Sequence, residues 1–154
     1  MKKKEMKAAL EALRKIKMPA IEDKKLRNGI IKDHLSLLRA QKAYERDIRN
    51  LDTVHFGAFA EEREEVAKLQ QQLGLETDAE KKIALVKQIE SHTELFDAVK
   101  AFNKDIDALG DEKVEILGIP QAEFLEEIVK QDFDLMQLEA LEPMFIDESD
   151  NLDL

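Results

Sequence analysis

Apolar residues recur every three or four positions across residues 77–110, which is the repeat of one face of an α-helix. Thr77 and Glu80 have the spacing of a capping box at a helix start, and Gly110 is typical of the position just after a helix end. No proline or glycine interrupts the stretch. The pattern predicts one long helix over about residues 77–109. Its apolar stripe consists of Ile83, Leu85, Val86, Ile89, Phe96, Val99, Phe102, Ile106 and Leu109.

Shorter helical patterns flank this helix and are expected to pack along it. They cover residues 3–17, 22–51, 58–73, 120–130 and 134–141, and the loops between the central ones are short. The apolar positions include Met6, Leu10 and Leu13 along one side of the first helix, and Leu26, Ile30 and Leu37 in the second. Short loops between long helices favour antiparallel neighbours. The expected fold class is therefore mainly α: an antiparallel helical bundle around the long helix at about 77–109, of the composition that bundles and coiled coils use.

The periodicity changes after Gly110. Residues 113–117 alternate between polar and apolar positions and include β-branched side chains, which is typical of a short strand. A lone strand leaves its backbone groups unsatisfied, and the evident partner is the segment around Pro19. We therefore hypothesise a short two-stranded β-ribbon that joins residues 17–21 to 113–117. The alternative is that these segments are helical or lie far apart.

Length and composition favour a single unit. The chain has 154 residues, of which 44% are hydrophobic and 38% charged, and it contains no cysteine. This excludes disulfides and cysteine-ligated zinc, and it fits a reducing compartment. We expect one helical domain over residues 1–146 and an acidic, mobile C-terminal tail over 147–154. No apolar run approaches a membrane span, so the expected location is the cytoplasm.

The net charge of −10 is unevenly distributed. Residues 1–50 hold 15 of the 24 Lys and Arg but only 7 of the 34 Asp and Glu, which leaves 9 basic and 27 acidic residues for the remainder. Such a split predicts a nucleic-acid contact by the N-terminal part. The favoured alternative is that basic helices pack beside acidic ones, because Tyr44 is the single aromatic residue in this part. The candidate nucleic-acid contacts are Lys2, Lys3, Lys4, Lys7, Arg14, Lys15 and Lys17.

The sequence shows no local arrangement for catalysis. Neither His34 nor His92 has a ligand at the spacing of a helical metal site, and His55 lies in a predicted turn. Carboxylate pairs such as Glu61 and Glu65 lack an apolar surround that would separate their pKa values. Phosphate-binding loops and nucleophile elbows are also missing. We therefore expect a protein that is not an enzyme, with no catalytic, metal or cofactor-binding residues. The alternative is a helical enzyme whose site is assembled by the fold.

Two patterns predict contacts with a protein partner or self-association. The long apolar stripe exceeds what the remaining helices readily cover, which favours dimerisation. Residues 137–145 combine a glutamine, a leucine and a terminal aromatic residue, as clamp-binding peptides do. The alternative for this segment is a short helix that closes the core. The candidate partner-binding residues are Leu135, Leu138, Leu141, Met144 and Phe145.

Several stretches together resemble a protein family. They are residues 102–109 with 112–116, residues 135–146, the helix at 8–13 and the Met18–Pro19 break. In these stretches the chain is similar to a family of small bacteriophage and prophage proteins of unknown function. The resemblance implies a non-enzymatic, phage-related protein that acts through protein–protein contacts, as a virion assembly or accessory factor. It also implies a location in the cytoplasm of a bacterial host cell or in the virion. It carries no functional residues across.

Overall fold

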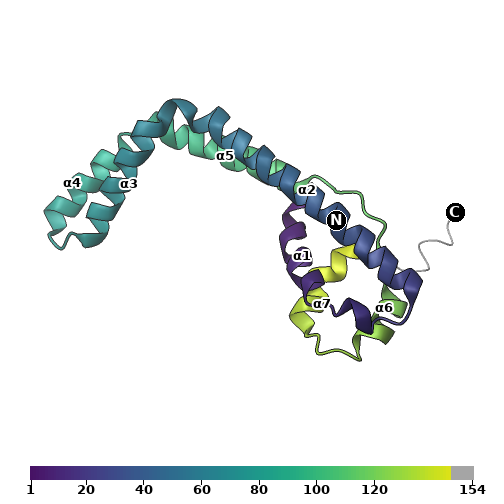
Figure 1. Cartoon of the computed structure of the whole chain (residues 1–154). Coiled ribbons are helices and arrows are strands. Elements are labelled where there is room, and N and C mark those ends of the chain that lie inside the picture. The colour runs from purple at the N-terminus through teal and green to yellow at the C-terminus, as the bar shows by residue number, and fades with distance from the viewer. Residues whose placement is uncertain (147–154) are drawn as a thin grey trace. The chain divides into compact units, whose positions relative to one another are not determined.

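A computed structural model describes residues 1–146 (Figure 1). The fold is mainly α, as the sequence predicts. The helices are α1 (Met6–Arg14), α2 (Lys24–Phe56), α3 (Ala60–Leu75), α4 (Ala79–Glu90), α5 (Thr93–Asp111), α6 (Gln121–Ile128) and α7 (Leu135–Leu141). Two short strands, β1 (Ile119–Pro120) and β2 (Phe145–Ile146), and four 3₁₀ turns complete the regular structure of the described residues.

The predicted continuous helix over 77–109 is wrong, because it divides into α4 and α5 at Ser91 and His92. The Ser91 hydroxyl donates to the backbone oxygen of Gln88 at 2.6 Å, and the His92 amide donates to the backbone oxygen of Ile89 at 3.2 Å. These contacts tighten the last turn of α4 and satisfy its terminal carbonyl groups. The helix start also differs by one residue, since Asp78 caps α4 by accepting from the Glu80 amide at 3.1 Å.

The predicted ribbon between residues 17–21 and 113–117 is also wrong. Met18–Ala20 forms a 3₁₀ turn that includes Pro19, and β1 pairs instead with β2, in parallel. The N-terminus itself lies against the predicted second strand, since the Val114 amide donates to the Met1 backbone oxygen at 2.8 Å. The Gln131 side chain holds the backbone of Lys17. The Lys17 amide donates to Gln131 Oε1 at 2.8 Å, and Gln131 Nε2 donates to the Lys17 backbone oxygen at 3.1 Å.

The chain forms two compact units. Of the described residues, unit 1 contains 1–46 and 109–146, and unit 2 contains 47–108. The boundary falls inside α2 and inside α5, so each of these helices contributes to both units. A single domain over 1–146 stays a prediction, and the predicted tail at 147–154 lies outside the described residues.

Unit 1 has an extensive apolar core. α1 presents Met6, Leu10 and Leu13 to it, which is the face that the sequence pattern predicts, and α1 packs against α7. Phe124 of α6 is fully buried, with its ring centroid 5.4 Å from that of Phe145 and 6.2 Å from that of Phe133. These contacts join α6 to the strand that follows α7.

Unit 2 has a smaller core. Its buried apolar residues within the described chain are Phe56, Val66 and Leu95. The Phe56 ring lies 5.0 Å from the Phe102 ring, and the Arg63 guanidinium lies 4.3 Å from the Phe56 centroid, within cation–π distance. α3 and α4 pack against each other as a helical hairpin.

Two glycines give opposite expectations for substitution by alanine. Gly118 has φ +88°, and a Cβ atom there would lie 2.6 Å from Ile146 Cγ2. Gly118→Ala should therefore lower the free energy of unfolding by about 1–3 kcal/mol.

Gly29 lies inside α2, and outside the backbone of its own helix no atom lies within 4 Å of the position that a Cβ would occupy. Gly29→Ala should therefore raise the free energy of unfolding by about 0.4–1 kcal/mol. Urea unfolding followed by circular dichroism measures both changes, and the same sign for both would contradict this account.

Candidate functional site

The predicted partner-binding segment mostly serves the core of unit 1. Leu141 and Met144 are fully buried, and Leu138 and Phe145 are partly buried against the same core. The segment is held in place by a capping box, in which Asp134 Oδ1 accepts from the Gln137 amide at 2.8 Å. A partner cannot reach Leu141 or Met144 in this fold. Of the five candidates, Leu135 is freely exposed, at 74%.

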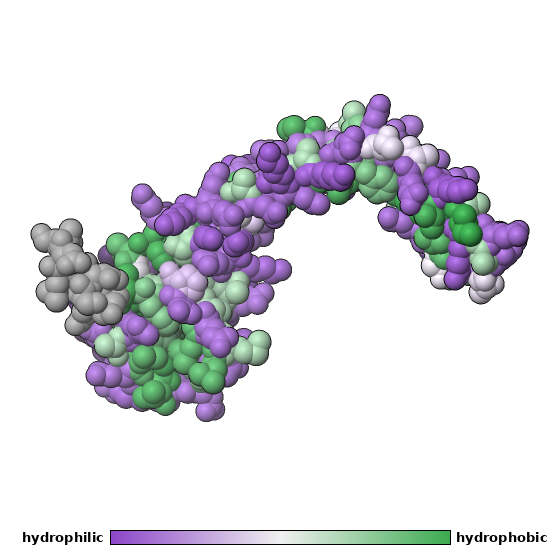
Figure 2. All heavy atoms as spheres, turned by 180° about the vertical axis from the view of Figure 1, so that it is seen from behind, coloured by the Kyte–Doolittle hydropathy of each residue, from purple (hydrophilic) through white to green (hydrophobic). Residues whose placement is uncertain are grey.

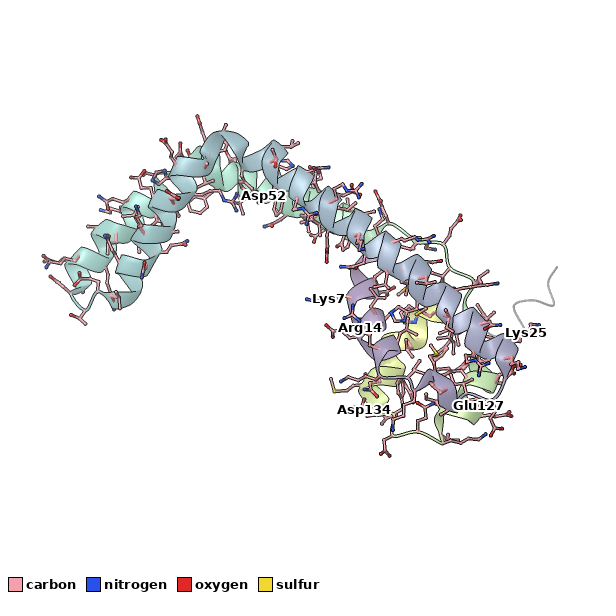
Figure 3. All side chains as sticks on the ribbon, viewed as in Figure 1. Lys7, Arg14, Lys25, Asp52, Glu127 and Asp134 are labelled. Carbon is pink, nitrogen blue, oxygen red and sulfur yellow. The ribbon has the colours of Figure 1, made fainter. Side chains whose placement is uncertain are left out.

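The predicted basic set divides into two groups. Lys2 and Lys4 lie 3.6 and 2.7 Å from Asp111, and Lys3 lies 2.6 Å from Glu112, so these lysines pair with acidic residues of the same unit. The hydrogen bond from Lys4, together with the charges of Lys4 and Lys2, lowers the pKa of Asp111. The remaining residues are exposed, and Figure 3 shows two of them along one side of α1. They are Lys7, Arg14, Lys15 and Lys17.

The histidines connect helices or flank the core. His55 Nε2 lies 2.7 Å from Asp105 Oδ2, and His92 Nδ1 lies 3.3 Å from Glu62 Oε2. Partial burial, with a smaller contribution from the charge of Arg14, lowers the pKa of His34. Within residues 1–146 no group of three or more His, Asp or Glu is arranged to hold a metal ion. No helix in the same range is long and apolar enough to cross a membrane.

The α3–α4 hairpin carries more apolar surface than it covers. None of the side chains within Ala79–Glu90 is fully buried, although α4 contains Ile83, Leu85, Val86 and Ile89. Ile83 is 57% exposed and Val86 37%. Leu85 and Ile89 are partly buried. A helix with apolar side chains on more than one side is typical of a buried helix, and here the hairpin alone does not bury it.

A groove of about 440 Å³ runs along this hairpin. On α4 its wall is built at positions i, i+3, i+4 and i+7, by Lys81, Ala84, Leu85 and Gln88. The end of α3 adds Leu75, which is 78% exposed. Figure 2 shows apolar atoms on the surface of this hairpin. The sequence predicts an apolar stripe that the neighbouring helices do not cover, and Ile83, Leu85 and Val86 belong to it. It does not show which part of the stripe is exposed, because the helix break after Glu90 was not predicted. We refer to four apolar residues of the hairpin together as the hairpin surface. Leu75 and Leu85 line the groove, whereas Ile83 and Val86 lie outside it, on the other side of α4.

A second hollow, the unit 1 pocket, has a volume of about 240 Å³. It lies between the first turns of α2 and the segment that leads from β1 into α6. Its walls combine buried apolar side chains with the carboxylates of Asp23 and Glu123. Local spacing could not indicate it, because its two walls are separated by about ninety residues of sequence.

Asp33 is the buried charged residue of the described chain, with no exposed surface. Its Oδ1 accepts from the Leu117 amide at 2.9 Å, and the Gly118 amide also donates to the carboxylate. Burial raises the pKa of Asp33, and these two donors offset part of that rise. Asp33 thus fixes the segment before β1 to α2, a role for which its sequence neighbours carry no signal.

Comparison with known proteins adds no family to these observations. No family model matches the sequence, and the searches of curated proteins and of solved structures give no match either. The resemblance to phage and prophage proteins therefore stays a prediction, and the function is inferred from the geometry of the chain.

Proposed function

We propose that this chain is a non-enzymatic protein that acts through protein–protein contacts, with the hairpin surface as its contact site. The observation that carries the proposal is α4, whose apolar residues occupy more than one side while none of them is fully buried. Exposed apolar area of this kind marks an interaction site in a folded protein. The resemblance noted in the sequence supports an assembly or accessory role for a phage or prophage.

The partner that fits this surface is a second copy of the same hairpin. Two helices cannot enclose a core between them, whereas two hairpins packed together form a four-helix bundle. The charges favour this arrangement: α3 carries four Glu against Arg63 and Lys68, and α4 carries three Lys against Glu80 and Glu90. In a two-fold symmetric pair, the acidic α3 of one copy can lie beside the basic α4 of the other.

Nucleic-acid binding through the N-terminal part is the weaker alternative. Lys2, Lys3 and Lys4 already pair with carboxylates of unit 1, so their charges are partly neutralised. Binding through the exposed basic residues would weaken steeply as salt concentration rises. A gel-shift titration at low salt would detect it.

Self-association is tested by the concentration dependence of mass in solution. We expect the full chain to form a dimer in sedimentation equilibrium, and the double variant Ile83→Glu/Val86→Glu to raise the dissociation constant at least tenfold. Both residues are exposed in the single chain, so the charges disturb the interface and leave each copy folded. Circular dichroism checks that the helix content is unchanged.

The matched control adds the same two charges elsewhere on the hairpin. Gln71→Glu/Thr77→Glu alters exposed polar positions and should leave the dimer intact. A wild-type chain that remains monomeric at all concentrations would overturn the assignment of a second copy. Equal weakening by both double variants would show that net charge, and not the hairpin surface, governs association.

A further inference from the structure

The unit 1 pocket has the chemistry of a ligand site that is independent of the hairpin surface. Its apolar wall contains Leu26, Ile30 and Ile119, each at most 4% exposed, together with Pro120. Gly29 lies between Leu26 and Ile30 in the lining, and the absence of a side chain there leaves the cavity open. An elongated apolar group fits such walls.

The polar contribution of the pocket is acidic. Glu123 lies in the lining, and its Oε2 is buried without a hydrogen-bond partner among the described residues. Glu123 is the third residue of α6, where a glutamate normally accepts from the amide of the N-cap residue. The N-cap here is Pro120, which has no N–H, so that bond cannot form.

The second carboxylate of the pocket, that of Asp23, already accepts hydrogen bonds from the backbone. Asp23 Oδ1 accepts from the amides of Lys25 and Leu26, at 3.0 and 3.2 Å, and thereby caps the first turn of α2. Lys25 also lies in the lining, but no ion pair joins it to Asp23 or Glu123 within residues 1–146. Glu123 is therefore the group that lacks a donor.

We propose that the unit 1 pocket binds a primary ammonium group carried on a short aliphatic stem. The ammonium donates to the Glu123 carboxylate, and the stem lies against Leu26, Ile30 and Ile119. A charge-assisted hydrogen bond of this kind is shorter and stronger than one from a neutral donor, and it gives the unpartnered Glu123 oxygen a donor. Such a group occurs in free aliphatic amines and in lysine side chains.

The same walls disfavour a divalent cation. Among the described residues no group of three or more His, Asp or Glu is arranged to hold a metal ion, and the apolar walls opposite Glu123 offer no polar groups to the waters that Mg²⁺ or Ca²⁺ would retain. The lining carries two carboxylates, of Asp23 and Glu123, against the one ammonium group of Lys25, so its net negative charge disfavours an anionic ligand. An ammonium group on an apolar stem matches both features of the pocket, because the ammonium pairs with the carboxylate and the stem contacts the apolar walls.

The test is a titration of the isotope-labelled full chain with n-pentylammonium chloride, followed by the amide resonances that line the pocket. We expect saturable shifts of the Gly29 and Gly118 amides. Glu123→Gln should weaken binding at least tenfold. Gly29→Leu, which fills the cavity without changing charge, should abolish it. Glu126→Gln, an exposed position on the same helix, should bind as the wild type does.

Two further probes complete the test. 1-Pentanol has the same stem without the charge and should bind at least tenfold more weakly. N-acetyl-lysine amide distinguishes the source, because comparable binding assigns the site to a polypeptide lysine, and binding of n-pentylammonium alone assigns it to a free amine. The absence of saturable shifts, or equal affinity in Glu123→Gln, would overturn the proposal. A monomeric chain could still bind the amine, so this test is independent of self-association.

Discussion

Phe124→Ala is expected to lower the free energy of unfolding of unit 1 by about 3–5 kcal/mol. The Phe124 side chain is fully buried and contacts the rings of Phe133 and Phe145. Its removal loses the transfer free energy of a whole ring, and it leaves a cavity where α6 meets β2. Urea unfolding followed by circular dichroism, with hydrogen exchange to locate the change, measures the effect. Exchange should increase for the amides of α1, α6 and α7.

The matched control is Val129→Ala, at the C-cap of the same helix. Val129 is 76% exposed, so its truncation should change the stability by no more than about 0.5 kcal/mol. If Phe124→Ala were as mild as this control, Phe124 would not be the centre of the core. An equal increase in exchange throughout unit 2 would show that the two units unfold as one.

The type and approximate position of most helices could be predicted from the sequence, because the apolar repeat survives in the core. Met6, Leu10 and Leu13 form the predicted stripe of α1 and are buried. In α2, the apolar residues Leu26, Ile30 and Leu37 of the predicted helix are likewise buried. In these segments local preference and tertiary packing agree, so the periodicity alone is sufficient.

The break between α4 and α5 could not be predicted, because it occurs without proline or glycine. Periodicity continues across Ser91 and His92, and the interruption depends on a side-chain hydrogen bond to Gln88. The strand partner was missed for a different reason. β1 and β2 are short and parallel, and their pairing depends on the packing of α6 and α7 between them. The residue pattern within either strand does not indicate a partner that lies this far along the chain.

The candidate sites also divide into features that local sequence shows and features that depend on contacts between distant residues. The apolar residues of the hairpin surface are visible in the sequence, but their exposure depends on where the helix ends. The unit 1 pocket and Asp33 depend on residues of α2 meeting residues around Gly118, far along the chain. Sequence spacing indicates contacts between residues a few positions apart. The residues that meet at the pocket and at Asp33 are about ninety positions apart.

Asp33 gives the second large effect. Asp33→Ala should lower the free energy of unfolding by at least about 2 kcal/mol, because hydrogen bonds to a charged acceptor contribute about 1.5–3 kcal/mol each. Two backbone amides, of Leu117 and Gly118, lose their acceptor, and part of the loss is offset because no carboxylate has to be desolvated. Asp107→Ala, at an exposed position, is the control and should stay within about 0.5 kcal/mol of the wild type.

The pH dependence of this effect has a defined sign. Burial raises the pKa of Asp33 above its ordinary value of 3.8, so the folded chain binds this proton more tightly than the unfolded chain does. The stability contributed by the protonated carboxyl is fully present below pH 3.8 and is lost as the pH rises through the raised pKa. Asp33→Asn cannot titrate. The wild-type free energy of unfolding minus that of Asp33→Asn should therefore be largest at low pH and fall as the pH increases.

Urea unfolding of both chains across this pH range measures the difference, and other titrating groups cancel because they are common to the two. A difference that rises with pH would mean that the donors Leu117 and Gly118 outweigh desolvation, with the pKa of Asp33 lowered. A difference that does not change would mean that the carboxylate is solvated and that the segment before β1 is not anchored to α2. Only the second result would remove the reason for the wall of the unit 1 pocket to be fixed, because Gly118 and Ile119 line the pocket directly after the segment that Asp33 holds.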